Sequence, residues 1–299
     1  MQPAILAIIV SYNSAAVLPA CLASLMTQAG VTVRIVVVDN GSKDGSAHVA
    51  RQVGAGVTVI DAGENLGFAK GCNRGLKEGL AGGESPPYVL FVNPDVRLER
   101  PELLAELAGK MAARPEAAIA TPRLVREDGT LDLACRRRFP GLWNGFCRAT
   151  GLANWPLPKR WVGGYNLLDR DELGDYAVPC VTGAFMLCET AFVQTAGGFD
   201  ERYFMYIEDV DLCWQAQERG REVWYFGSLS ARHAKGHASA AISDDMLAAL
   251  FRSTRLWYEK NRFGRMNFFS RGLTRLGLWA WERMARLRNR LRARKSAQP

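Results

Sequence analysis

Four short polar segments in the first third of the chain each follow an apolar run and carry side chains that could hold a phosphorylated ligand. Their members are Ser11, Tyr12 and Asn13; Asp39, Asn40 and Gly41; Asn65 and Gly67; and Asn93 and Asp95. Carboxylates accept hydrogen bonds and bind cations, whereas glycines let backbone N–H groups approach a phosphate. These residue types indicate a site for a nucleotide and a metal ion, if the fold brings the four segments together.

Asp39 is the candidate for contacting a nucleobase. It ends an apolar run, where its carboxylate could accept a hydrogen bond from the N3–H group of uracil or thymine. The alternative is a structural role, because Asp39, Asn40, Gly41 and Ser42 also form a favourable turn sequence. The glycines near Asn65 likewise allow two interpretations, a diphosphate held at a helix N-terminus or a plain glycine-rich connection.

Asp95 and His233 are the candidates for binding a divalent cation. Asp95 could hold Mg²⁺ or Mn²⁺, hard cations that take oxygen ligands and share them with substrate phosphates. His233 as a second ligand would favour Mn²⁺ over Mg²⁺. A turn-capping aspartate and an ordinary hydrogen-bonded histidine are the structural alternatives.

Three carboxylates, Glu208, Asp209 and Asp211, lie close together at the start of a predicted helix. Acidic residues interact favourably with the dipole at a helix N-terminus, and this alone could account for them. Such a cluster could also supply a general base, because neighbouring negative charges raise the pKa of a carboxyl group. Trp214 and the other aromatic residues nearby either form a platform for a sugar or belong to the core.

The elements that must position these residues follow from the apolar pattern. Buried strands are predicted at residues 5–10, 33–38, 57–60 and 88–92, and helices at about 17–25, 69–80 and 101–113. Strands that alternate with helices predict an α/β fold with a mostly parallel sheet. Ligands bind beyond the carboxyl ends of such strands, so the four polar segments are expected to share one edge.

The second half of the chain is less regular. We expect loops over residues 123–178, strands at 180–187 and 222–226, and a helix from residue 208 to residue 219.

Composition excludes several classes of protein. With 48% hydrophobic and 23% charged residues, the 299-residue chain is typical of a globular protein, not of a disordered or disulfide-framework chain. No apolar run approaches the roughly 20 residues that span a bilayer, and no signal peptide is expected. The seven scattered cysteines fit a reduced, cytoplasmic protein. The chain lacks the P-loop and GxGxxG motifs, which argues against P-loop kinases and dinucleotide-binding Rossmann domains.

Positive charge is concentrated at the C-terminal end. The net charge is +8, but residues 252–299 alone contribute +12 and the remainder of the chain −4. An apolar stripe at helical spacing is formed by Leu273, Leu276, Ala280, Met284, Leu287 and Leu291. Beside or opposite it lie Arg275, Arg283, Arg286, Arg290 and Arg294, with Trp279 and Trp281. This pattern predicts a helix on an anionic membrane surface; the alternative is a helix packed on the protein with a solvated basic face.

Taken in order, these motifs resemble those of the inverting glycosyltransferases of family 2. The resemblance covers about residues 4–240 and is closest to the rhamnosyltransferase-like branch, which builds bacterial cell-surface polysaccharides. The matching segments are residues 10–13, 37–42, 65–69 with Asn73, 93–95, 197–200, 204–212, and His233 with Gly236. One departure is Asn93, which stands where the general DxD motif has its first aspartate.

The resemblance implies a GT-A fold over residues 1–240, a mostly parallel Rossmann-like sheet flanked by helices. Residues 1–120 would form the nucleotide-sugar-binding half and residues 121–240 the acceptor-binding half, followed by a basic helical extension over residues 241–299.

The resemblance also implies roles for individual residues. The first strand end and Asp39 would hold the base, and the segment from Asn65 to Asn73, with Phe68, would lie along the ribose and diphosphate. Asp95 and His233 would bind Mn²⁺ or Mg²⁺, beside Asn93. Asp209 would deprotonate the acceptor hydroxyl. On the acceptor side we expect Thr182, Gly183, Glu208 and Trp214.

The sequence therefore predicts a metal-dependent inverting glycosyltransferase. We expect it to move L-rhamnose from dTDP-rhamnose onto a lipid-linked or polysaccharide acceptor at the cytoplasmic face of the membrane. A UDP-hexose donor is the alternative within the family. Alternatives from other classes are a nucleic-acid-binding protein that uses the basic tail and a non-catalytic subunit that binds a sugar nucleotide.

Overall fold

The computed structural model describes residues 2–54, 56–81, 85–141, 143, 155, 164–234 and 243–296, with side chains described as far as residue 290. The chain divides into two compact units. Unit 1 comprises residues 1–137, 171–204 and 208–235, and unit 2 comprises residues 138–170, 205–207 and 236–299. Gly236 lies outside the described residues, and the domain boundary expected at residue 240 stays a prediction.

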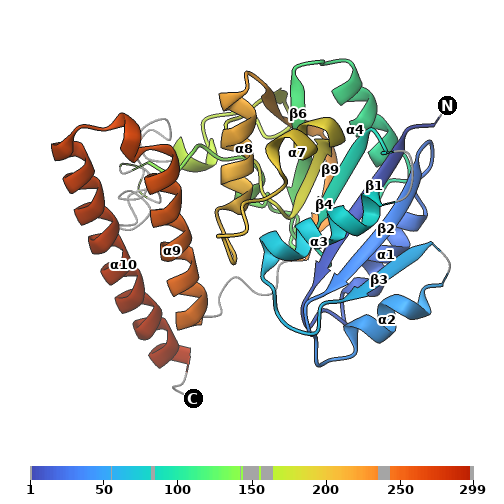
Figure 1. Ribbon diagram of the computed structural model, residues 1–299, viewed down its shortest axis with the longest axis horizontal. Coiled ribbons are helices and arrows are strands. Elements are labelled where there is room, and N and C mark those ends of the chain that lie inside the picture. Colours follow the sequence, from blue (N-terminus) through green and yellow to red (C-terminus); the bar gives the residue numbers. More distant parts are fainter. Residues whose placement is uncertain are drawn as a thin grey trace. The chain divides into compact units, whose positions relative to one another are not determined.

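A nine-stranded sheet forms the centre of unit 1 (Figure 1). Its strand order is β3-β2-β1-β4-β8-β6-β9-β5, with β7 paired to β9. The strands are β1 (Ala4–Ser11), β2 (Thr32–Asp39), β3 (Val57–Asp61), β4 (Tyr88–Val92), β5 (Val96–Arg97), β6 (Ala117–Val125), β7 (Asp175–Ala177), β8 (Phe185–Glu189) and β9 (Glu222–His233).

The first four strands are mutually parallel, as their alternation with helices predicts. Ser11 lies opposite Asp39 and Asp39 lies opposite Asp61, so β1, β2 and β3 end at one edge of the sheet. Strand β8 then runs antiparallel to β4 and β6, and β9 returns parallel to β6. The predicted α/β fold with helices flanking a largely parallel sheet is confirmed.

The helices of unit 1 connect and cover these strands (Figure 1). They are α1 (Leu18–Met26), α2 (Ser46–Gln52), α3 (Phe68–Leu80), α4 (Leu103–Ala112), α7 (Thr190–Ala196) and α8 (Glu208–Glu218), with the 3-10 turn η1 (Leu133–Cys135). The predicted helices near residues 69–80, 101–113 and 208–219 are confirmed to within two residues.

Unit 2 contains a pair of C-terminal helices, α9 (Asp244–Asn261) and α10 (Phe268–Ser296), which lie side by side (Figure 1). The short turns η3 (Gly164–Asn166) and η4 (Phe263–Arg265) also belong to it. None of the helices in the described part of the chain is both long enough and apolar enough to cross a membrane.

Three expectations for the second half of the chain were wrong. Strand β6 was missed because its sequence contains alanines and Pro122; the proline sits at a register shift in the β6–β9 pairing, where a missing N–H is tolerated. Strand β8 begins at Phe185 and not at Cys180, because residues 182–185 form a turn. Strand β9 continues to His233, so this histidine ends the strand and does not follow it.

A stripe of glycines brings α3 unusually close to β1. Gly71, Gly75 and Gly79 recur every four residues, and a Cβ atom on each would lie within 3.0 Å of the side chain of Val10, Ile8 or Leu6 respectively. The β1 side chains at these contacts occupy the space that larger helix residues would need. Close packing at this seam positions the N-terminus of α3 at the edge where the strands end.

Substitution of Gly75 by alanine is expected to lower the free energy of unfolding by about 1–3 kcal/mol, since the new Cβ would lie 2.6 Å from Cγ2 of the buried Ile8. The matched control is Gly109→Ala in α4, where nothing lies within 4 Å of the new Cβ. That change is expected to raise stability by about 0.5–1 kcal/mol through helix propensity. Urea unfolding measures both, and equal effects of the two substitutions would contradict the packing account.

Candidate active site

Backbone and side-chain hydrogen bonds join the first three polar segments into one site. Asn13 accepts a hydrogen bond from Lys43 N–H (2.9 Å), and its own N–H donates to Ser42 Oγ (3.0 Å). The Asn40 amide donates to the carbonyl of Gly67 (2.9 Å). The ends of β1 and β2 and the N-terminus of α3 are therefore tied together, as the shared-edge prediction requires.

Asp39 combines both of the roles considered for it. One carboxylate oxygen, Oδ1, accepts a hydrogen bond from Ser42 N–H (2.9 Å) and so caps the turn. The other oxygen, Oδ2, is buried and has no hydrogen-bond partner among the described residues. Ser11 Oγ and Asn40 Oδ1, both at the same edge, are likewise buried without a described partner.

Buried polar atoms in folded proteins are nearly always hydrogen-bonded, and each exception needs an explanation. Unpartnered acceptor atoms at the strand ends could each accept a hydrogen bond from a bound base or ribose. Tyr12, which precedes Asn13, is half exposed and lies at the rim of this edge.

The loop before α3 depends on Asn65 and Gly67. Asn65 Oδ1 accepts a hydrogen bond from Gly67 N–H (3.0 Å), and Phe68 N–H donates to the carbonyl of Phe204 (2.8 Å). Gly67 has a φ of 81°, and a Cβ there would lie 2.2 Å from that carbonyl oxygen. No other residue fits this position. Gly41, with a φ of 73°, is similarly confined by the backbone of Glu64.

Asn73 has a structural contact that the sequence did not indicate. Its side-chain amide donates to the carbonyl of Phe199 (2.8 Å), and its oxygen accepts from Phe199 N–H (2.9 Å). The amide thus holds the turn after Gly198. The predicted contact of Asn73 with a donor stays a prediction.

Asp95 and His233 lie next to each other because β5 pairs with the end of β9. Val96 is opposite His233 in this pairing, and Ala234 N–H donates to the carbonyl of Asp95 (2.9 Å). The distance from His233 Nε2 to Asp95 Oδ1 is 3.3 Å. On the other side of the ring, His233 Nδ1 contacts Oδ2 of the buried Asp132 at 2.8 Å.

The electrostatics of His233 are set by this pair of carboxylates. Burial alone would lower the pKa of the imidazole, but the hydrogen bonds to Asp132 and Asp95 outweigh it and raise the pKa above the ordinary value. The proton on the imidazole that lies between the two carboxylates is therefore held more tightly than on a free histidine.

The residues present fit a divalent cation that is shared with a substrate. Two ligands of one Mg²⁺-sized ion, each about 2.1 Å from it, lie roughly 3 Å apart when adjacent, close to the separation of Asp95 and His233. Asp132 then provides the carboxylate that orients a metal-binding histidine. Within the described ranges, no three or more His, Cys, Asp or Glu side chains could hold a metal by themselves. Phosphate oxygens of a donor would complete the coordination.

Asp209 reaches the same edge through strand β8. Asn93 N–H donates to the carbonyl of Ala184 (2.9 Å), and Gly183 N–H donates to Asp209 Oδ2 (2.9 Å). The same oxygen also accepts from Arg137 Nη2 (2.6 Å). Asp209 is therefore held in place by an ion pair and a backbone amide beside the end of β4.

Glu208 has a different environment. Burial raises the pKa of its carboxyl group to about 8, and the neighbouring charge of Asp209 acts in the same direction. Its Oε2 atom is buried with no partner among the described residues. The backbone just before it is strained, with a φ of 72° at Ile207.

The other predicted acceptor-side residues, and the nearby Asp211, have contacts within the protein. Thr182 Oγ1 accepts from Ala184 N–H (3.3 Å) in the turn that carries Gly183. Trp214 is buried on α8, so the core interpretation of this residue is the one its burial favours. Asp211 is fully buried and accepts from Tyr203 Oη (3.1 Å), which gives the third carboxylate a structural role.

Two residues of this site, Asp132 and Arg137, were not predicted from the sequence. Both lie in the region expected to be loops, which carried no periodicity to place them. The Arg136-Arg137-Arg138 run was the only available signal for Arg137, and nothing distinguished Asp132 from other turn-forming aspartates.

The family model described as glycosyl transferase family 2 matches residues 6–190. The chain belongs to this family. An N-acetylglucosaminyl-diphospho-decaprenol L-rhamnosyltransferase of Mycobacterium tuberculosis is 30% identical over 264 residues, covering 85% of this chain and 84% of the relative. The rhamnosyltransferase WbbL of Escherichia coli K12 is 29% identical over 152 residues, covering 50% of this chain and 53% of that protein.

Solved structures agree with this family 2 glycosyltransferase in fold. GalNAc-T7 with UDP, GalNAc and Mn²⁺ matches with a TM-score of 0.57 at 14% identity, covering 87% of this chain and 49% of that chain. Residues 1–349 of S. aureus TarS in complex with UDP match with a TM-score of 0.54 at 15% identity, covering 87% and 66%. The resemblance identified from the sequence motifs is confirmed, and with it the fold.

The raised pKa of Glu208 predicts how the free energy of unfolding of this glycosyltransferase depends on pH. Its folded-state pKa of about 8 lies above the ordinary glutamate value, so between the two values the folded protein binds a proton that the unfolded chain has released. The contribution of Glu208 is therefore present at low pH and is lost as pH rises toward about 8.

The substitution Glu208→Gln should flatten this part of the curve of unfolding free energy against pH, whereas the exposed helix residue control Glu78→Gln should not. Urea titrations between pH 5 and pH 9 measure both curves. Parallel curves for wild type and Glu208→Gln would show that the carboxyl group is ionised in the folded protein throughout.

Proposed function

We propose that the chain is a metal-dependent inverting glycosyltransferase that transfers L-rhamnose from dTDP-rhamnose to a lipid-linked or polysaccharide acceptor. The observation that carries the proposal is the convergence at one sheet edge of a buried, unpartnered Asp39 oxygen, the Asp95–His233 pair and the anchored Asp209. Nucleobase, diphosphate and acceptor each need one of these groups. The names of both relatives support rhamnose as the transferred sugar, and the name of the Mycobacterium tuberculosis relative supports a lipid carrier for the acceptor.

In the proposed reaction, the acceptor hydroxyl oxygen attacks the anomeric carbon as the bond from that carbon to the diphosphate breaks. Asp209 takes the hydroxyl proton, and the electron pair of the broken bond leaves with the diphosphate. Because attack and departure occur on opposite faces in one step, the configuration at the anomeric carbon inverts. The ion pair with Arg137 and the hydrogen bond from Gly183 keep the carboxylate oriented for this step.

Asp95 and His233 would hold Mn²⁺ or Mg²⁺, with His233 fixed by Asp132. Bound there, the cation would neutralise charge that develops on the departing diphosphate. Asn93 sits beside this pair, with its N–H used in the contact to Ala184. Donor sugars activated by nucleotides and acceptors on lipid carriers would meet at the cytoplasmic face of a membrane.

A UDP-linked hexose is the second candidate donor. A carboxylate oxygen such as Asp39 Oδ2 accepts a hydrogen bond from uracil N3–H as well as from thymine N3–H, so this contact does not discriminate between them. The two similar structures named above both contain UDP.

Substitution of Asp209, the proposed general base, should lower the rate of transfer without weakening binding of the donor nucleotide. Asp209→Asn is expected to lower the transfer rate by about 10²–10⁴-fold, because the amide cannot accept the hydroxyl proton. Affinity for dTDP should stay within about twofold of wild type. Exposed Asp128→Asn serves as the control. Turnover near the wild-type rate in Asp209→Asn would contradict the assignment of the base.

Asp132 should act through His233 without touching the donor. Asp132→Asn is expected to weaken Mn²⁺ binding in the presence of dTDP by about 10–100-fold, as loss of a supporting carboxylate usually does. Binding of Mn²⁺ can be followed by electron paramagnetic resonance of the free ion. If the Mn²⁺ affinity of Asp132→Asn equals that of wild type while His233→Ala abolishes binding, Asp132 does not position the histidine.

A further inference from the structure

Helix α10 has one face committed to contacts with α9. Thr274 and Leu278 are buried there, and Trp281 packs edge-on against Phe251 of α9, with ring centroids 5.0 Å apart. Glu282 on the same side forms an ion pair with Arg255 of α9. This face alone accounts for the packing of the two helices within unit 2.

The apolar stripe predicted from the sequence lies on a different face of α10. At about 100° per residue, its members fall within roughly 80° of arc, centred roughly 140° away from the face that packs on α9. Leu273, Leu276 and Leu287 are each at least 60% exposed. The stripe therefore does not serve to pack α10 on α9. Leu291 and Arg294 lie outside the residues whose side chains are described.

The exposed apolar surface continues at the N-terminal end of the helix. Phe268 and Phe269 are 85% and 84% exposed, the most exposed of the large apolar side chains described in the structure. Phe269 lies on the line of the stripe, one turn before Leu273. Two adjacent exposed phenylalanines on a helix are costly in water, so an apolar partner is expected.

A basic flank borders the stripe. It consists of Arg275, Arg283, Arg286 and Arg290, which fall on one side of α10, together with Trp279. The guanidinium of Arg283 lies over the Trp279 ring at 5.4 Å from its centroid. Of these arginines, Arg286 pairs with Glu282, whereas no described residue forms an ion pair with Arg275, Arg283 or Arg290.

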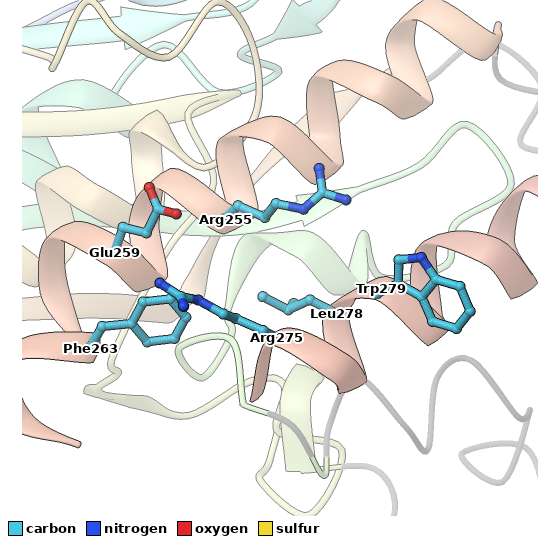
Figure 2. A pocket seen from close by; sticks show the side chains of 6 residues that line it. All are labelled: Arg255, Glu259, Phe263, Arg275, Leu278 and Trp279. Atoms are coloured by element: carbon cyan, nitrogen blue, oxygen red, sulfur yellow. The ribbon is translucent and has the colours of Figure 1, made fainter. Parts of the chain in front are cut away.

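A pocket of about 290 Å³ opens on this flank between α9, η4 and α10 (Figure 2). Phe263 and Leu278 supply its buried apolar lining, and Arg275 lies over the Phe263 ring at 5.2 Å from the centroid. Arg255, Glu259 and Trp279 complete the lining. The pocket thus offers arginine donors beside apolar walls, the combination that fits a phosphate group attached to an apolar chain.

Almost all charged side chains of helix α10 are positive. Glu282 is the only acidic residue from Phe268 to Ser296, and it is already paired with Arg255 and Arg286. Each side chain that could repel an anionic surface from α10 is therefore neutralised within unit 2. A helix that lies in the plane of a membrane interface typically combines an apolar stripe, a basic flank and an interfacial tryptophan, and α10 has all three, with Trp279 as the tryptophan.

We propose that α10 binds the surface of an anionic phospholipid leaflet, with Phe268, Phe269 and the stripe inserted among the acyl chains and the basic flank among the lipid phosphates. The inference rests on the C-terminal helices and holds whichever sugar donor the enzyme uses. It places the lipid phosphates beside Arg275, Arg283 and Arg290, none of which forms an ion pair with a described residue.

The test is co-sedimentation of the full-length chain with vesicles of phosphatidylcholine, with or without phosphatidylglycerol. Wild type should bind vesicles that contain phosphatidylglycerol, and salt should weaken the binding. The triple change Leu273→Gln, Leu276→Gln and Leu287→Gln should lower the partition coefficient at least about 10-fold. Arg283→Gln and Arg290→Gln should each lower it about fivefold, only on anionic vesicles.

Matched controls lie elsewhere on the surface: Leu173→Gln, which is 57% exposed in unit 1, and Arg51→Gln on α2. Neither should change vesicle binding, and unchanged thermal unfolding of the triple variant would exclude a folding defect. Wild-type levels of binding by the triple variant would overturn the proposal. The proposal would also be overturned if the wild-type chain did not bind anionic vesicles but instead dimerised through the stripe or bound RNA or DNA.

Discussion

The site depends on one constraint, the antiparallel entry of β8 beside β4. Parallel strands alone would place the polar segments that follow β1, β2 and β4 at one edge but would leave the carboxylates of α8 elsewhere. Because Val92 pairs with Phe185, the turn at Thr182 and Gly183 arrives at the end of β4, and the Gly183 amide then holds Asp209 there. The polar segments after the parallel strands and the Asp209 carboxylate thus meet through the β4–β8 pairing, the Gly183 hydrogen bond and the Arg137 ion pair.

Several features of this edge are unfavourable for the protein by itself. Buried polar atoms without partners each cost about 1–3 kcal/mol, and Asp39, Ser11 and Asn40 contribute one such atom each. Glu208 is buried, and Ile207 holds a backbone conformation that non-glycine residues rarely adopt. Such features concentrate where a ligand supplies what the protein lacks.

Local pattern was enough to predict much of this structure. Uninterrupted apolar runs identified β1 to β4, since a strand buried on both faces must be apolar throughout. The motif residues Asp39, Asp95, His233 and Asp209 all reach the predicted edge. Strand β6 was not predicted because its alanines and Pro122 are not typical of a strand. Asp132 and Arg137 were not predicted because their roles arise only from long-range contacts. Helix α10 is a further example, because periodicity predicted its apolar stripe but only the structure shows that a different face contacts α9.

The central claim is that the strand edge around Asp39 and Asp95 binds a pyrimidine nucleoside diphosphate together with a divalent cation. Isothermal titration with dTDP and UDP, each with and without Mn²⁺, tests it most directly. Mn²⁺-dependent binding of dTDP and UDP is expected, together with a marked loss of dTDP affinity in Asp39→Ala. Tighter binding of dTDP than of UDP would support the rhamnose donor. Absence of binding by either pyrimidine nucleotide with Mn²⁺ present would contradict the account.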